Sequence, residues 1–96
     1  MNFKFLAEAL SEFDDAAGWY DQQRPGLGAE FVDAVESAIR RLTGKPETWP
    51  MIDSQFRRCP VENFPYDVVF ACRNEAILIF AIAHHHRKPD YWSGRK

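Results

Sequence analysis

The sequence lacks the features that mark membrane-spanning and exported proteins. Its run of apolar residues at 76–83 is eight residues long, whereas a helix needs about 18 apolar residues to cross a bilayer. The N-terminus has no basic segment followed by an apolar one, as an export signal would have. We therefore expect a cytoplasmic protein without a membrane partner.

The sequence also has little that indicates a metal or cofactor site. Its two cysteines, Cys59 and Cys72, are widely spaced among strand-like residues, so we interpret them as reduced core thiols rather than a disulfide. A zinc site formed by His84, His86 and Asp90 is an alternative, but it lacks the cysteine-rich or helical spacing of familiar zinc sites. We expect no metal and no cofactor.

Positive charge is scarce in the first half of the chain and concentrated at its end. Residues 1–44 contain eight acidic and four basic residues, whereas residues 45–96 contain six and eight. The last thirteen residues contain four basic residues and a single acidic one, Asp90. This asymmetry suggests an anionic or acidic partner at the C-terminal end, or equally a solvated tail.

Residues 76–84 form the predicted central strand. The segment is rich in isoleucine and has no polar side chain before His84, which is typical of a strand buried on both faces. We expect it to carry the cationic and aromatic residues that follow it to the surface. His84 and His86 should lie on one face and His85 on the other, if the strand continues.

Two amphipathic helices are predicted before this strand. Apolar residues recur at spacings of three and four over residues 7–23 and again over 28–43. Arg24-Pro25-Gly26-Leu27-Gly28 separates them as a turn. The lone Gly-x-Gly within it lacks the preceding strand and the further glycine of a dinucleotide site.

Further strands are predicted over 2–6, 55–61 and 66–73, with a hairpin loop at Arg73-Asn74-Glu75. The order β-α-α-β-β-β predicts an α+β fold in which a helical hairpin packs on one face of a mostly antiparallel four-stranded sheet. Residues 1–96 are long enough for a single domain. We expect its core to contain Phe13, Val35, Ile39, Phe70, and Ile79 or Phe80.

Several short motifs, spread in order along nearly the whole chain, carry a family resemblance. They are Trp19-Tyr20, Pro25-Gly26-Leu27-Gly28, Phe31-x-x-x-Val35, Pro46, Trp49-Pro50, Arg57-Arg58, Phe64-Pro65-Tyr66 and Ile82-Ala83-His84, followed by Arg87, Pro89, Tyr91-Trp92 and Arg95. Together they resemble toxins of the RelE/ParE superfamily, which belong to bacterial type II toxin–antitoxin modules. The resemblance implies a similar topology and a cognate antitoxin that wraps around the toxin.

The superfamily resemblance implies two kinds of target. One branch cleaves mRNA on the ribosome, and ParE-like members are described as inhibitors of DNA gyrase. Ribonuclease members typically carry an arginine at the position of Asp67, where a carboxylate would repel phosphate, and they use lysines, which this chain lacks between Lys45 and Lys88. The Pro-Gly-Leu-Gly and Phe-Pro-Tyr stretches also look more like the ParE side.

We therefore expect a ParE-like toxin that is not an enzyme, inhibits gyrase, and binds its target through Arg87, Tyr91, Trp92 and Arg95. We expect Asp67 to lie near the C-terminal cluster and to pair with a local arginine. The alternative is a ribosome-dependent endoribonuclease with Arg58, His86, Arg87 and Tyr91 as catalytic residues. A third possibility is a degenerate member that only binds its antitoxin.

Overall fold

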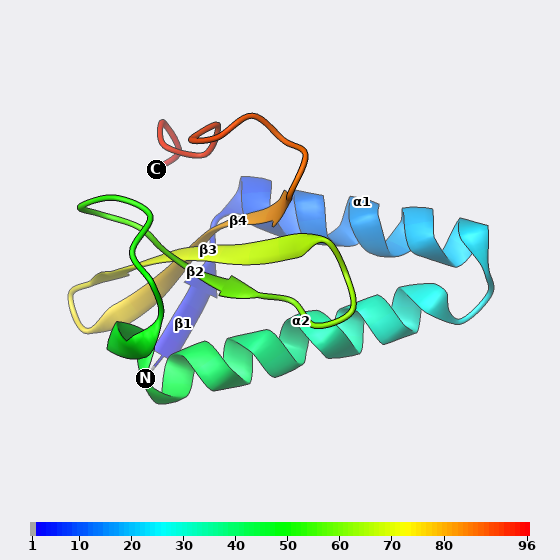
Figure 1. Cartoon of the computed structure of the whole chain (residues 1–96), viewed down its shortest axis with the longest axis horizontal. Coiled ribbons are helices and arrows are strands. Elements are labelled where there is room, and N and C mark those ends of the chain that lie inside the picture. Colours follow the sequence, from blue (N-terminus) through cyan, green and yellow to red (C-terminus); the bar gives the residue numbers. More distant parts are fainter. Residues whose placement is uncertain (1) are drawn as a thin grey trace.

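The computed structural model describes residues 2–96 and confirms the predicted element order (Figure 1). The elements are β1 (Asn2–Phe5), α1 (Ala7–Gln23), α2 (Leu27–Gly44), a short 3₁₀ helix (Pro46–Thr48), β2 (Arg57–Pro60), β3 (Tyr66–Arg73) and β4 (Ala76–His84). The four strands form one sheet in the order β1-β4-β3-β2. β1 pairs with β4 in parallel, and the other two pairings are antiparallel, so the predicted α+β class with a mostly antiparallel sheet is confirmed.

The two helices form the predicted hairpin, and a single carboxylate fixes the turn between them. Asp21 Oδ1 accepts hydrogen bonds from the backbone N–H groups of Gly26 and Gly28, at 3.0 and 3.3 Å. Gly26 has a φ of 91°, which favours glycine. Because Asp21 already occupies the first N–H groups of α2, this Gly-x-Gly serves as a helix–helix turn. No helix within residues 2–96 is both long and apolar enough to cross a membrane.

The helices cover one face of the sheet and bury the main core there. Val35 and Ile39 of α2 and Phe70 and Ile79 of the sheet are buried in it, and Phe13 packs against it as a partly buried ring. The predicted core is therefore confirmed, but Phe80 lies outside it. Phe80 is fully buried, but it belongs to a second cluster, which contains residues from the opposite face of the sheet.

A β-bulge in β4, at Phe80, changes which of the residues after it face the helices. Phe70 pairs with Ile79 and Val69 pairs with Ala81, so Phe80 is the extra residue. One inserted residue reverses the in–out alternation beyond it. As a result, His84 lies on the helix side of the sheet, against Tyr66, with ring centroids 5.0 Å apart.

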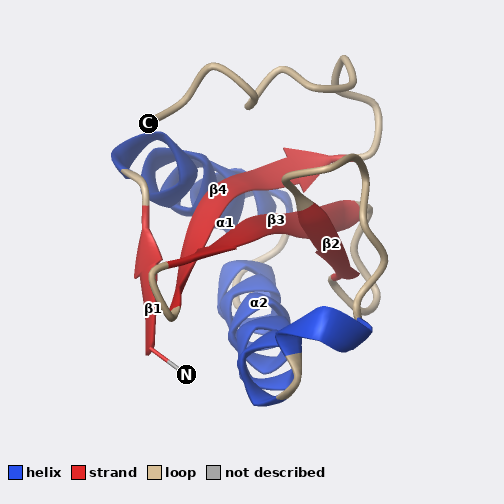
Figure 2. Ribbon diagram, turned by 90° about the vertical axis from the view of Figure 1, so that its left-hand side faces the viewer, coloured by secondary structure: helices blue, strands red, loops and turns tan. Residues whose placement is uncertain are grey.

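The second face of the sheet is covered by the C-terminal segment 85–96 and by the loop before β2. Figure 2 shows the C-terminal segment passing over the sheet on the side opposite α2. Trp92 and Phe56 are 7% and 2% exposed and pack with Phe80. This covering makes β4 buried on both faces, as predicted. The prediction that the residues after β4 form a surface cluster is wrong for Trp92, because its ring fills the gap over this face.

Two local predictions need correction. The strand predicted over 55–61 is shorter, because Asp53 forms a turn by accepting hydrogen bonds from the N–H groups of Gln55 and Phe56. Cys72 is exposed at the end of β3, so only Cys59 is a core thiol, and both cysteines are free. β2 is an edge strand, which suits Pro60, because proline has no N–H to donate to a neighbouring strand.

Candidate functional site

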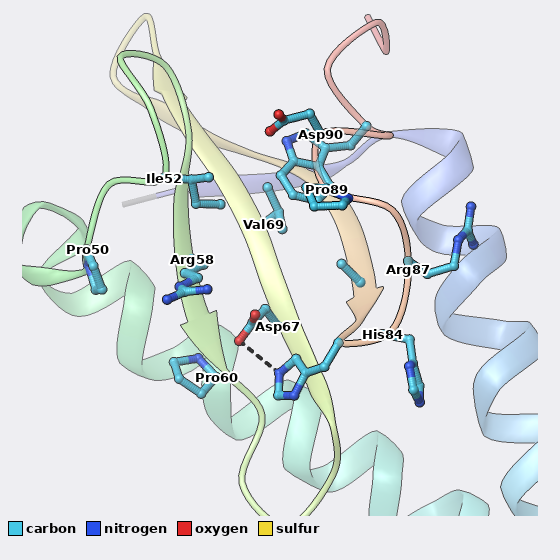
Figure 3. A pocket seen from close by; sticks show the side chains of 13 residues that line it. Pro50, Ile52, Arg58, Pro60, Asp67, Val69, His84, Arg87, Pro89 and Asp90 are labelled. Atoms are coloured by element: carbon cyan, nitrogen blue, oxygen red, sulfur yellow. Dashed lines mark ion pairs between the residues drawn. The ribbon is translucent and has the colours of Figure 1, made fainter.

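A cleft of about 530 Å³ lies on the face of the sheet opposite the helices. Its walls come from the loop before β2, from three neighbouring strands and from the C-terminal segment (Figure 3). The residues that line it are Pro50, Ile52, Arg58, Pro60, Asp67, Val69, Ala83, His84, His85, Arg87, Pro89, Asp90 and Trp92. A cleft of this size with mostly apolar walls and a few charged groups is the usual form of a binding site.

Alternation along β2 places one arginine of the Arg57-Arg58 pair in this cleft. Arg57 lies toward the other face and donates hydrogen bonds to the carbonyl oxygens of Trp49, at 2.6 Å, and Glu47, at 3.2 Å. It therefore anchors the loop that precedes β2. Arg58 pairs with Val69 across the strands and is exposed on the cleft side.

Asp67 lies within the cleft and pairs with a histidine. His85 Nε2 is 3.4 Å from Asp67 Oδ1, and the Asp67 side chain is 16% exposed. Figure 3 shows Arg58 on the neighbouring strand, beside this pair. Asp67 therefore lies near the C-terminal cluster, as predicted. The prediction that Asp67 pairs with an arginine is wrong, because its partner is His85, the first residue after the end of β4.

The other two histidines lie on the opposite side of the sheet from His85. The rings of His84 and His86 are 5.0 Å apart, and His84 Nδ1 accepts a hydrogen bond from the His86 N–H at 3.0 Å. Burial, together with the neighbouring histidines, lowers the pKa of His84. Within residues 2–96, no three histidine, cysteine or carboxylate side chains are grouped closely enough to hold a metal ion, so the alternative zinc site with Asp90 is not formed.

The residues named for the ribonuclease alternative are not assembled around one point. Arg58 and Arg87 both line the cleft, but His86 and Tyr91 do not. In Figure 3 the Arg87 side chain points toward the helix rather than toward Asp67. Its guanidinium carbon lies 4.0 Å from the centre of the Tyr91 ring. Burial, and then the nearby Glu12 carboxylate, raises the pKa of the Tyr91 hydroxyl, which makes it a poor proton donor to a leaving oxygen at neutral pH.

The C-terminal segment is fixed by an ion pair that joins its end to α1. Arg95 donates to both carboxylate oxygens of Glu12, at 2.9 and 2.8 Å, and to the carbonyl oxygen of Phe80 at 2.8 Å. Glu12 Oε1 also accepts the Ile82 N–H at 3.1 Å. These bonds give partners to the backbone N–H and carbonyl groups of β4 that lie beyond its pairing with β1. Arg95 and Trp92 thus hold the segment in place over the sheet.

A shallower hollow of about 380 Å³ lies between α1 and β4. Trp19, which is 56% exposed, lines it together with Asp15, Ile82, His84 and Arg87. Arg87 therefore stands on the ridge between this hollow and the cleft. Both are open surfaces, so a partner protein can reach them without any change in the core.

Comparison with known proteins identifies the family. The model of the family described as the ParE toxin of the type II toxin–antitoxin system, parDE, matches residues 3–89. The chain belongs to the ParE toxin family. Among curated proteins, no sequence matches this chain significantly.

A solved structure supports the fold of this ParE-family chain. A chain of the chromosomal ParDE toxin–antitoxin system from P. aeruginosa has a TM-score of 0.77 and 18% sequence identity. The match covers 88% of this chain and 95% of that chain. At this identity the likeness shows the fold, and it agrees with the predicted topology. The family match over residues 3–89 confirms the resemblance to the RelE/ParE superfamily and to its ParE side.

Sequence reasoning did not predict the contacts of two residues that shape the site, or the backbone geometry of a third. His85 was assigned only to the face opposite its neighbours, and its partner Asp67 is 18 positions away. Glu12 was given no role from the sequence, although it binds Arg95, 83 positions further along the chain. Asp90, which lines the cleft, has a positive φ of 66°. No local pattern signals the first two contacts, since both depend on how the C-terminal segment folds back.

Proposed function

We propose that this chain is a toxin that inhibits DNA gyrase, acts in the cytoplasm, and is neutralised by a cognate antitoxin. Membership of the ParE family supports the toxin–antitoxin role. The choice of target is supported above all by Asp67, which places a carboxylate in the cleft on the face of the sheet opposite the helices.

The charges of the cleft argue against phosphodiester cleavage. Cleavage of RNA adds negative charge at the phosphate in the transition state, and cationic groups must stabilise it. Two carboxylates, Asp67 and Asp90, line the cleft. His85 is paired with Asp67 and is not free to bind a phosphate. Arg58 and Arg87 also line the cleft, but the Arg87 side chain points toward the helix, so Arg58 is the arginine left to face a phosphate there. This balance favours contact with a protein over catalysis on a nucleic acid.

The four residues expected to bind the target fall into two groups in this proposal. Arg87 is exposed and lies on the ridge between the two hollows, so it contacts the target directly. Tyr91, Trp92 and Arg95 hold the C-terminal segment against the sheet and thereby position that ridge. Substituting Arg87 should then weaken the target complex without affecting folding, whereas substituting Trp92 should do both.

The test is a supercoiling assay with purified gyrase. The protein should reduce supercoiling in proportion to its concentration, and the product of the adjacent gene, added as antitoxin, should restore it. In parallel, ribosome-bound mRNA should stay intact. Reproducible cleavage of that mRNA, lost in His86→Ala or Arg58→Ala, would instead support the ribonuclease alternative. No effect in either assay, with a stable antitoxin complex, would support a member that only binds its antitoxin.

A further inference from the structure

We propose that the cleft recognises an extended segment of the protein target that places a carboxylate against Arg58 and an apolar side chain between Ile52 and Val69. This inference rests on the proposed function, because it names the part of the toxin that the target contacts and the chemistry of the contact. It assigns a role to Arg58, which the expected target-binding set did not include.

The middle of the cleft is apolar and rigid. Ile52 and Val69 face it, and Pro50, Pro60 and Pro89 stand around it. Proline has no backbone N–H and a fixed φ. These three residues therefore offer a ligand no backbone hydrogen-bond donor, and their backbone has little freedom to change conformation. A preformed apolar wall lowers the entropic cost of binding, and its volume of about 530 Å³ suits a large side chain together with part of its backbone.

The polar groups stand around this apolar middle. Figure 3 shows Arg58 and Asp67 together at one end of the cleft and Asp90 at the other, with Val69 between them. Within residues 2–96, Arg58 has no ion pair and no hydrogen bond from its side chain. Asp67 is engaged by His85. The group that lacks a partner at this end of the cleft is therefore a cation, and its complement is a carboxylate.

The same arrangement favours a protein segment over a nucleic acid. A phosphate backbone carries a charge at every nucleotide and is bound by several cations in a row. A strand of RNA in this cleft would meet Arg58 but also two carboxylates, Asp67 and Asp90. Arg87 also lines the cleft, but its side chain points toward the helix. A protein segment can place one carboxylate beside the arginine and keep the rest of its contact neutral.

The experiment measures binding of the full-length protein to the purified gyrase subunits by titration. Arg58→Glu should weaken binding at least about 10-fold, because it replaces an attractive charge pair by a repulsive one. The matched control is Arg40→Glu, at an exposed arginine on α2 whose side chain makes no ion pair or hydrogen bond within residues 2–96. Arg40→Glu makes the same change in net charge and should leave binding within about two-fold, as expected for a charge outside the interface.

A second pair of variants tests the apolar part and the sign of the partner's charge. Ile52→Glu and Ile52→Lys remove the same apolar side chain, so both should weaken binding. Ile52→Glu should weaken it more, by about a further factor of five, since only the glutamate repels an acidic segment. Thermal melts and complex formation with the antitoxin verify that each variant is folded.

Each outcome decides a different point. If the wild-type protein neither binds gyrase nor inhibits supercoiling, the proposed function and this inference fall together. If it inhibits gyrase and Arg58→Glu binds as well as Arg40→Glu does, the proposed function stands and this site is wrong. Equal losses for the two Ile52 variants would contradict the acidic partner. Binding of a fluorescent single-stranded RNA that is lost in Arg58→Glu would assign the cleft to nucleic acid.

Discussion

The ion pair between Glu12 and Arg95 is the contact on which the C-terminal segment most depends. Their side chains are 17% and 15% exposed, and the two shortest N–O distances are 2.8 and 2.9 Å. Arg95 also donates to the Phe80 carbonyl oxygen, and Glu12 accepts the Ile82 N–H. Replacing Arg95 by methionine therefore leaves a carboxylate and a strand-edge carbonyl without their donor, while most of the apolar side-chain volume is kept.

The cost of this change can be estimated from the burial of the pair. Removing one partner of a fully buried ion pair costs about 3–5 kcal/mol. Because these side chains keep some contact with water, we expect about 2–4 kcal/mol for Arg95→Met. For a domain of this size that lowers the melting temperature by about 10–20 °C. Arg95→Lys should lie in between, because an ammonium group keeps the charge but cannot form the two parallel bonds.

The measurement is the free energy of unfolding from urea titration, with an exposed ion pair as the control. Arg24 and Glu30 are 59% and 58% exposed and lie 3.2 Å apart. Arg24→Met should cost less than about 1 kcal/mol, as solvent-exposed pairs usually do. A cost for Arg95→Met no larger than that for Arg24→Met would refute the conclusion that this pair holds the C-terminal segment. A double-mutant cycle with Glu12→Gln should give a coupling energy of about 1–3 kcal/mol.

Three further predictions follow from local geometry. Gly28→Ala should destabilise the fold by about 1–3 kcal/mol, because the added Cβ would lie 2.6 Å from the Ala17 carbonyl oxygen. Gly18→Ala, which has open space around it, should instead stabilise α1 by about 0.5–1 kcal/mol. Equal melting temperatures for the two variants would contradict the close contact between the helices at Gly28. At about pH 8, a thiol reagent should label the exposed Cys72 but not Cys59, since burial raises the pKa of Cys59 to about 11; labelling of both in the native state would show that the core is open. The pKa of His84 is lowered in the folded chain, so the folded chain binds fewer protons at this site than the unfolded chain does. The free energy of unfolding should therefore fall as the pH drops below about 6.5. His84→Gln should make that fall smaller.

The fold could be predicted from the sequence because each element has a strong local signal. The apolar spacing of the two helices, the proline and glycines between them, and the apolar strand at 76–84 all favour one arrangement. The Asn74–Glu75 turn shows the limit of such reasoning. The hairpin loop was predicted at the right place, and Asn74 has a positive φ of 52°, which asparagine tolerates, but Glu75 also has a positive φ, of 61°.

The candidate site was less predictable because it depends on contacts between distant residues. The charge of Asp67 was visible in the sequence, but its partner His85 becomes apparent only when β3 and β4 are paired in register. The β-bulge at Phe80 adds a residue that no sequence pattern indicates, and it determines which histidines face the helices. The position of Arg95 depends on Glu12, on an element at the other end of the chain.

The most direct test of the account compares the wild-type protein with Arg58→Glu and Arg40→Glu in gyrase supercoiling, over the same range of protein concentrations. We expect the wild type and Arg40→Glu to inhibit supercoiling equally, and Arg58→Glu to need at least about 10 times more protein for the same inhibition. Supercoiling that is unaffected by the wild-type protein, while the same preparation cleaves ribosome-bound mRNA, would contradict the account.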